Sequence, residues 1–459
     1  MSKSERKTVF REDLCTRCGI CFNKCPVLEL PIEEAKKEII RLIEGKQSKY
    51  VLSKCTTCFS CNLFCPENAN PYQLILERWN DLYYKRGVPP LYTFVCPTRE
   101  DNIWQLLNVF LSTQEKKWIL RWMNNTPKPE DVVLLIGNYT HLFPFIIGGS
   151  KILDYFAPVD LIDQWEGGAY LYQGGYLDLV QRIAYRTKQD FDKWDTKNIV
   201  AALDAVEYIF QEAHPNHMNV EHKQSFSSLQ EWLLDNIKSG ELKIENPLNM
   251  TITVHDNCYS KVFEGKYWNI ARDIIKKCGC EMIEMRHNKE NSLCCGFGAG
   301  ASWVKNISIP FDIIHEGIKK FREAEETGAD ALVSYCGGCI YLLWATKELM
   351  GSKIDLFHII EVLRMAMGEK LDYPKVHIER AWDIIAIITY VWLISLVRKR
   401  FFIKKITYDQ NKSTFRPKNF YLLKFIRSAF KSSLIKKIFR KMFLVLTKLL
   451  NTREKVIPL

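Results

Sequence analysis

Cys15-x-x-Cys18-x-x-Cys21-x-x-x-Cys25-Pro26 is the first of two equal cysteine frames in this sequence. The second frame begins about 40 residues later and reads Cys55-x-x-Cys58-x-x-Cys61-x-x-x-Cys65-Pro66. This spacing is typical of proteins that hold two iron–sulfur clusters, where three close thiolates bind one cluster and the fourth, beside proline, binds the other. Zinc knuckles and disulfides are the alternatives, but a zinc site pairs two C-x-x-C units and needs no third cysteine at this step.

The frames therefore predict two cubane [4Fe–4S] clusters that exchange their fourth ligands. The expected ligands of the first cluster are Cys15, Cys18, Cys21 and Cys65. The expected ligands of the second cluster are Cys55, Cys58, Cys61 and Cys25.

The segment between the frames predicts a helix over residues 32–43, because its apolar residues recur on one helical face. This linker is longer than that of a minimal bacterial ferredoxin and resembles the helical ferredoxin domain of respiratory dehydrogenases. We expect that domain over residues 1–90. Its second long helix should cover residues 71–86, starting at Pro71 after an N-cap from Asn70.

The bulk composition indicates a folded protein of a reducing compartment. With 459 residues, 47% of them hydrophobic and 25% charged, the chain is expected to form two to four domains. The 16 cysteines favour metal binding over disulfides, because residues 1–11 lack the apolar core of a signal peptide. We therefore expect a cytoplasmic protein.

After a helical linker over residues 91–129, apolar runs of strand length alternate with helical stretches. The expected strands are 132–136, 159–162, 199–202, 251–254, 282–285 and 331–334. This alternation predicts parallel sheets with right-handed crossovers. We expect an α/β multidomain protein whose two α/β repeats occupy residues 130–245 and 246–370.

The later repeat carries a third cysteine set, whose members follow expected strands or the loops after them. The set consists of Cys258, Cys294, Cys295, Cys336 and Cys339. The carboxyl ends of parallel strands share one edge of a sheet, so these thiolates are expected to converge there. His255 precedes the first of them and is interpreted as a structural histidine with satisfied hydrogen bonds. The histidines at 214, 217 and 222 are interpreted as part of a solvated loop.

The pattern Cys258-x35-Cys294-Cys295-Gly296-x39-Cys336-x-x-Cys339 resembles that of the cysteine-rich CCG-domain family. This family includes heterodisulfide reductase subunits and the iron–sulfur subunits of anaerobic glycerol-3-phosphate dehydrogenase and glycolate oxidase. Two ferredoxin frames followed by two α/β repeats make the chain similar to the D subunit of the heterodisulfide reductases. The resemblance implies that the five cysteines of the third set bind a noncubane [4Fe–4S] cluster. A zinc ion held by four of the five is the alternative.

The first repeat departs from the family pattern because it lacks cysteines. Trp165-Glu166-Gly167-Gly168 stands where Trp-Cys-Cys-Gly is expected, and Tyr139 and residues 203–206 occupy the other cysteine positions. We expect this repeat to be degenerate, with the fold of the family but without a cluster.

Charge is segregated along the chain. Residues 398–459 contain 18 Lys and Arg against 2 Asp and Glu, a net charge of +16, whereas the remaining residues have a net charge of −5. From Leu422 to Leu449 apolar residues recur every three or four positions among basic ones, which predicts a basic amphipathic helix. Residues 371–459 are therefore expected to form a tail on an anionic membrane surface, at the inner face of the cell membrane. Docking on an acidic partner subunit is the alternative, and the apolar run 381–397 is a short candidate for a membrane span.

The resemblance implies an iron–sulfur electron-transfer subunit that relays electrons between two cubane clusters and the third cluster. Its expected partners are a flavoprotein dehydrogenase or reductase, or other subunits of the heterodisulfide reductase type, beside the quinone pool. No nucleotide-binding glycine fingerprint is visible, so NAD or FAD is expected on another subunit. Nucleic acid is not an expected partner, because the sequence contains no recognition module. The alternatives are an enzyme that reduces a disulfide or another sulfur compound at the third cluster, and a non-redox zinc scaffold.

Overall fold

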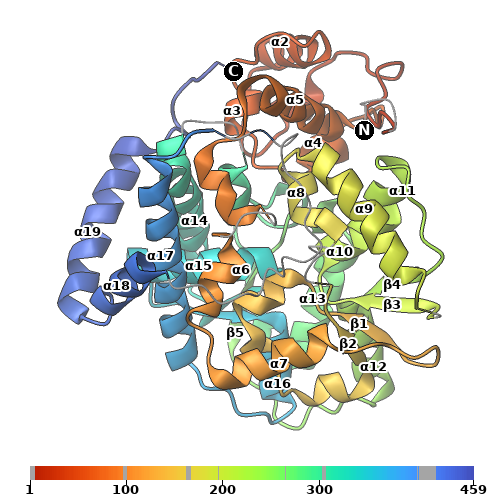
Figure 1. The fold of residues 1–459 in the computed structure, drawn as a ribbon, viewed down its shortest axis with the longest axis vertical. Coiled ribbons are helices and arrows are strands. Elements are labelled where there is room, and N and C mark those ends of the chain that lie inside the picture. Colours follow the sequence, from red (N-terminus) through yellow and green to blue (C-terminus); the bar gives the residue numbers. More distant parts are fainter. Residues whose placement is uncertain are drawn as a thin grey trace.

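The fold joins a helical N-terminal part to two parallel sheets and a group of C-terminal helices (Figure 1). The computed structural model describes residues 6–96, 101–161, 167–194, 196–263, 265–301, 306–400, 402 and 420–458. Figure 1 places the cysteine-frame helices at the top, the sheets below them, and the last helices along one side. This arrangement confirms a helix-rich α/β architecture with two parallel sheets.

The N-terminal part contains the two long helices that the sequence predicts. Helix α2 (Ile32–Ile43) and helix α5 (Pro71–Arg86) have the expected bounds, and α2 buries Ala35, Ile39 and Leu42. The side chain of Asn70 does not cap α5 as expected, because its Nδ2 donates a hydrogen bond to the Val9 carbonyl at 3.3 Å. The short helices α1 (Ile20–Asn23), α3 (Val51–Lys54) and α4 (Ser60–Leu63) carry or flank the frame cysteines.

The two cysteine frames share one backbone conformation as well as one spacing. Arg17 and Thr57 have φ angles of 57° and 54°, and Gly19 and Phe59 have φ angles of 78° and 61°. A side chain in this left-handed region costs roughly 1–2 kcal/mol, so three non-glycine residues keep a conformation that their sequence disfavours. Such strain is typical of functional sites, and here it recurs at the same positions of both frames.

The first sheet is parallel, with strand order β2-β1-β3-β4. Its strands are β1 (Val133–Leu135), β2 (Ala157–Val159), β3 (Asn198–Ala201) and β4 (Ser225–Ser228). The helices of this part are α8 (Ala169–Gln173), α9 (Leu177–Phe191), α10 (Asp204–Tyr208) and α12 (Leu229–Ser239). Apolar residues of the central strands are fully buried, as in a sheet covered on both faces.

The second sheet repeats this order as β6-β5-β7-β8 and is also parallel. Its strands are β5 (Thr251–His255), β6 (Glu281–Met282), β7 (Ala331–Ser334) and β8 (Asp355–His358). Its helices are α13 (Lys266–Lys277), α14 (Ile309–Glu326), α15 (Gly337–Met350) and α16 (Ile359–Ala366). The edge strands β4 and β8 were not among the expected strands.

The linker and the tail are divided more finely than the sequence suggests. The linker forms α6 (Ile103–Asn108) and α7 (Thr113–Met123), and the tail forms α17 (Lys375–Ser395), α18 (Tyr421–Ala429) and α19 (Ser433–Leu450). Among the residues described, none of these helices combines the length and the apolar character that crossing a bilayer requires. The short candidate span 381–397 lies mostly in α17, which packs along α15.

Candidate iron–sulfur site

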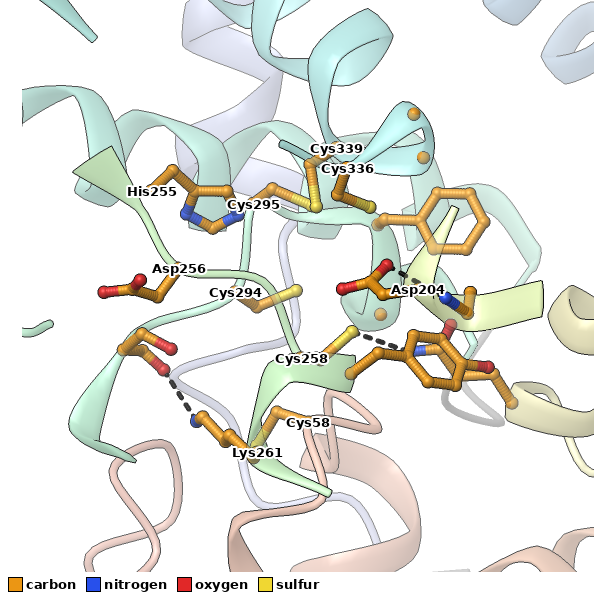
Figure 2. A pocket seen from close by; sticks show the side chains of 18 of the residues that line it. Cys58, Asp204, His255, Asp256, Cys258, Lys261, Cys294, Cys295, Cys336 and Cys339 are labelled. Carbon is orange, nitrogen blue, oxygen red and sulfur yellow. Dashed lines mark hydrogen bonds between the residues drawn. The ribbon is translucent and has the colours of Figure 1, made fainter. Parts of the chain in front are cut away.

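The five cysteines of the third set line one cavity. Figure 2 shows their side chains around a common space beside Asp204, and the frame residue Cys58 lines the same cavity next to Lys261. The cavity lies where the loops after β5 and β7 meet the loop that carries Cys294 and Cys295, as the sheet topology predicts.

Different elements position these cysteines. Cys258 lies three residues after β5, at the start of a short 3-10 turn. Cys336 is the N-cap residue of α15 and Cys339 lies in its first turn. Cys294 and Cys295 precede the turn Phe297–Gly300, and the Gly296 N–H donates to the Cys294 sulfur at 3.3 Å. The N-terminus of α15 therefore directs backbone N–H groups and two thiols at the same centre.

Two glycines let neighbouring segments of the backbone approach this loop closely. Gly296 has a φ of +104°, and a Cβ there would lie 2.2 Å from the Ile313 carbonyl oxygen. A Cβ on Gly298 would lie 1.8 Å from the carbonyl oxygen of Thr56, between two cysteines of the second frame. The absence of a side chain at Gly298 thus allows the second frame to pack directly on the third set.

The donor set of this cavity fits a metal centre. His255, Cys295 and Cys339 are buried and each offers a ligand atom within 4.8 Å of the others. Burial raises the pKa of Cys258, and the neighbouring thiols of Cys336 and Cys295 raise it further. Several buried thiolates repel one another unless a cation compensates their charge, and iron is a cation that soft sulfur ligands prefer.

His255 is not the satisfied structural histidine that the sequence suggested. It is buried at the end of β5, and neither of its ring nitrogens makes a hydrogen bond to the described residues. A buried imidazole next to Cys295 and Cys339 is a further candidate ligand or hydrogen-bond partner of a metal centre.

Three residues that sequence reasoning missed also reach the cavity. Gln173 at the end of α8 donates from Nε2 to the Thr57 carbonyl at 3.0 Å and to the Cys258 sulfur at 3.2 Å. Asp204 accepts a hydrogen bond from Asn257 Nδ2 at 2.7 Å, and burial raises its pKa to about 6.

The third missed residue is Lys261, which is buried beside the second frame. Its Nζ donates to the Ser60 hydroxyl at 2.7 Å and to the Ser292 carbonyl at 3.0 Å. Its place three residues after Cys258 was a weak signal in the sequence, and Asp204 lies in the segment 203–206 that stands at an expected cysteine position, whereas nothing local marked Gln173.

A buried ion pair holds the loop between His255 and Cys258. Arg272 binds both carboxylate oxygens of Asp256 at 2.9 Å, and the Tyr335 hydroxyl donates to Asp256 at 3.0 Å. Burial alone would raise the pKa of Asp256, but these donors hold it below its ordinary value. The charged, bidentate pair therefore fixes the strand end from which Cys258 projects.

The first cysteine set is brought together near the surface of the N-terminal part. Burial raises the pKa of Cys15, and the thiols of Cys65 and Cys18 raise it further. Burial also raises the pKa of Cys21, where Cys65 and Cys18 again contribute. Cys65, from the other frame, thus lies near Cys15 and Cys21 of the first frame. Cys15, Cys18 and Cys65 are partly exposed.

The second set is deeper and gathers Cys25 with the cysteines of the other frame. Burial raises the pKa of Cys25 to about 12, with a further contribution from the thiol of Cys58. Burial also raises the pKa of Cys61, and its neighbours include Cys55 and, from the first set, Cys21. The second set therefore lies beside the first set, where α4 packs on α1, and reaches the third cavity through Cys58.

The cysteine-less repeat contributes to the same cavity. Leu203, Asp204 and Ala205, at the position where the family pattern expects a C-x-x-C, line it together with the third set. The residues Trp165 and Glu166 and the side chain of Tyr139 lie outside the part of the chain that the structure describes.

The histidines of this repeat are not in a solvated loop, which corrects that interpretation. His214 and His217 are buried, and burial lowers the pKa of each to about 3. His214 contacts His222 at 2.8 Å and the Gly167 carbonyl at 2.7 Å. Through these contacts, His214, which directly follows the π-helical turn after α10, binds the loop before α8. We therefore assign a structural role to His214.

Known proteins match the two cysteine-bearing parts. Residues 7–66 match the model of the 4Fe-4S dicluster domain, and residues 252–343 match the model of the cysteine-rich CCG domain. The D subunit of the heterodisulfide reductase of Methanosarcina barkeri is 24% identical over 396 residues, which cover 78% of this chain and 94% of that protein.

Two further relatives match over shorter regions. The probable iron–sulfur-binding oxidoreductase FadF of Bacillus subtilis is 31% identical over 205 residues, covering 42% of this chain and 28% of that protein. The EtfAB:quinone oxidoreductase of Syntrophomonas wolfei is 28% identical over 143 residues, covering 28% of this chain and 19% of that protein.

These matches coincide with the three cysteine sets that the structure gathers, so iron–sulfur cluster binding is the role of this part of the molecule. The chain carries a 4Fe-4S dicluster domain and a CCG domain, and it is homologous to the D subunit of heterodisulfide reductase and to FadF-like iron–sulfur oxidoreductases.

Proposed function

We propose that this protein is the electron-transfer subunit of a multisubunit redox complex. In this complex the three cysteine sets would be successive electron-transfer sites. Two cubane [4Fe–4S] clusters at the first and second sets and a noncubane cluster at the third, when bound, would accept and release single electrons. The observation that carries this proposal is the position of the second set between the other two: α4 packs on α1 of the first frame, and Cys58 lines the cavity of the third set.

The chain's own residues hold the second and third sets at a fixed separation. Gln173 links the Thr57 carbonyl to the Cys258 sulfur, and Gly298 lets the loop at Thr56 approach the third set. Gln173 comes from the cysteine-less repeat, which we interpret as a degenerate CCG repeat. Through Gln173, this repeat stabilises the contact between the second and third sets. It also forms one wall of the cavity, instead of binding a second cluster.

The exposed end of this series is the first set. Three of the four cysteines of the first set are partly exposed, against one of four in the second set (Cys55) and two of five in the third (Cys258 and Cys294). A partner subunit would therefore exchange electrons at the first set. Relatives are subunits of heterodisulfide reductase and an EtfAB:quinone oxidoreductase, which supports a flavoprotein or a heterodisulfide-reductase-type subunit as that partner.

A second candidate function is reduction of a disulfide at the third set. The carboxyl group of Asp204, which lines the cavity of the third set, favours this candidate. In that reaction the S–S bond breaks, two electrons arrive from the partner subunit through the cysteine sets, and two protons are taken up to give two thiols. Anaerobic turnover of a small disulfide with a low-potential donor would distinguish catalysis from relay alone.

Metal analysis tests the main proposal. Protein purified without air should contain about twelve iron atoms per chain and a similar amount of acid-labile sulfide, because each of three sets would hold four irons. Electron paramagnetic resonance of reduced and oxidised samples should resolve three centres. Four iron atoms or fewer per chain would refute the relay, and eight irons with one zinc would assign the third set to zinc.

Substitution of Lys261 should change the second centre selectively. Its ammonium donates to Ser60, whose hydroxyl lies 3.3 Å from the Cys58 sulfur, so the charge lies within about 6 Å of that sulfur. Lys261→Met removes a buried positive charge that favours the reduced state. The reduction potential of the second centre should fall by on the order of 100 mV.

Redox titration followed by electron paramagnetic resonance measures this shift. Lys266→Met, which removes a half-exposed cation paired with Glu231, is the matched control and should leave all three potentials unchanged. An unchanged second potential in Lys261→Met, with full iron content, would mean that this lysine does not influence the second set.

A further inference from the structure

The helical pair α18–α19 presents an apolar face to the outside of the molecule. The exposed apolar residues of α19 are Leu434, Ile435, Ile438, Met442, Val445 and Leu449. The corresponding residues of α18 are Tyr421, Leu422 and Phe425. Leu434 is 65% exposed and Phe425 is 72% exposed, so these side chains do not pack within the described chain. We call these nine residues the outer stripe.

The opposite face of the pair is firmly docked. Leu423, Ile426 and Phe443 are buried against the body of the protein, and α19 packs on α14 and α15 while α18 packs on α17. Arg427 binds Asp383 at 2.6 Å and Arg440 binds Glu348 at 2.6 Å. The helical pair therefore has a separate core-facing side, and the outer stripe is a second apolar side that the fold itself leaves uncovered.

Lysines border the outer stripe on one side. Lys437, Lys441 and Lys448 are exposed, and their spacing of four and seven residues places them in a row next to Leu434 and Ile438. The segment 421–450 contains no Asp or Glu, and the two arginines with carboxylate partners face inward. The outward-facing charge of the pair is therefore exclusively positive.

We propose that the outer stripe inserts into the interfacial region of an anionic lipid bilayer. An apolar row that occupies the 18 residues of α19, or about 27 Å, together with a parallel row of lysines, matches an acyl boundary beside anionic headgroups. A protein partner would need carboxylates along the same line, whereas a bilayer offers negative charge everywhere on its surface. This inference is independent of the relay function proposed above.

Hydrogen bonds and an ion pair just beyond α19 connect the pair α18–α19 to the part of the molecule that carries the cysteine sets. Just beyond α19, Thr452 donates from its hydroxyl to Asp312 at 2.7 Å, and Arg453 binds Glu316 at 3.0 Å. Arg453 also donates to the Lys54 carbonyl at 2.7 Å, next to the second-set ligand Cys55. A bilayer bound at the outer stripe would hold the second set in a fixed orientation to the membrane plane (Figure 1 places α19 along one side of the molecule).

Vesicle sedimentation of the full iron-loaded chain tests this inference. The wild type should sediment with vesicles of phosphatidylglycerol and phosphatidylcholine, and binding to pure phosphatidylcholine should be much weaker. Substitution of Lys437, Lys441 and Lys448 by Gln should weaken binding to the anionic vesicles by on the order of a hundredfold. Ile438→Ser with Met442→Ser should weaken binding to both kinds of vesicle.

The matched control replaces three exposed lysines elsewhere, Lys238, Lys276 and Lys277, by Gln and should bind like the wild type. Iron content and the three paramagnetic signals should be the same in all variants, which separates this test from that of the relay. Equal binding of the two triple variants would overturn the proposal. So would a dimer that Ile438→Ser disrupts and that prevents vesicle binding.

Discussion

Cys295→Ser is expected to remove about four of the roughly twelve iron atoms and to abolish the paramagnetic signal of the third centre. Cys295 is buried in the middle of the third set, with its sulfur within 4.8 Å of ligand atoms of both His255 and Cys339. A serine hydroxyl is a harder and weaker ligand for iron than a thiolate. The first and second sets lie outside this loop, so their signals should persist.

The control for this substitution is Cys280→Ser. Cys280 is also buried, but it lies before β6 and does not line the cavity. Its replacement should retain the full iron content and all three signals. If Cys295→Ser keeps twelve irons, or loses the signals of the first two centres as well, the assignment of a separate third centre is wrong.

Gly298→Ala is expected to move the second and third sets apart and to slow electron transfer between them. The new Cβ would lie 1.8 Å from the Thr56 carbonyl oxygen, and real Cβ atoms essentially never approach closer than 3.0 Å. The turn Phe297–Gly300 and the loop at Thr56 must therefore move apart by more than 1 Å. We expect unfolding to become easier by about 1–3 kcal/mol. The third centre should also be reduced more slowly than in the wild type.

Rapid-freeze electron paramagnetic resonance after mixing with a low-potential donor measures the second effect, and thermal unfolding measures the first. Gly328→Ala is the control, because Gly328 has a φ of +71° and open space around the added methyl group. It should cost about 1 kcal/mol of stability and leave reduction of the third centre unchanged. Equal reduction rates in Gly298→Ala and the wild type would contradict the proposed junction.

Local patterns in the sequence predicted most of the secondary structure. Helices α2 and α5 begin and end at the expected residues, because their apolar residues recur with helical periodicity. The strands β1, β3, β5 and β7 lie within or near apolar runs that are buried on both faces.

The missed strands have a common physical cause. Strand β4 has the sequence Ser-Phe-Ser-Ser and is half-exposed, and β8 begins with Asp355. Both are edge strands, stabilised by pairing with β3 and β7 instead of by their own hydrophobicity. The predicted single helix over 422–449 likewise divides at Phe430–Ser432, because its two halves pack on different helices of the body.

The sequence by itself indicated iron–sulfur cluster binding, because the spacing of thiols within the two short frames is typical of such clusters. Only the tertiary structure decided how the sets are connected and what surrounds them. Gln173, Asp204 and Lys261 reach the cavity from three distant segments, and their contacts depend on how the two sheets and the frame helices pack. The same holds for the tail: its amphipathic pattern is local, but the packing of α14, α15 and α17 decides which apolar residues are buried and which remain outside.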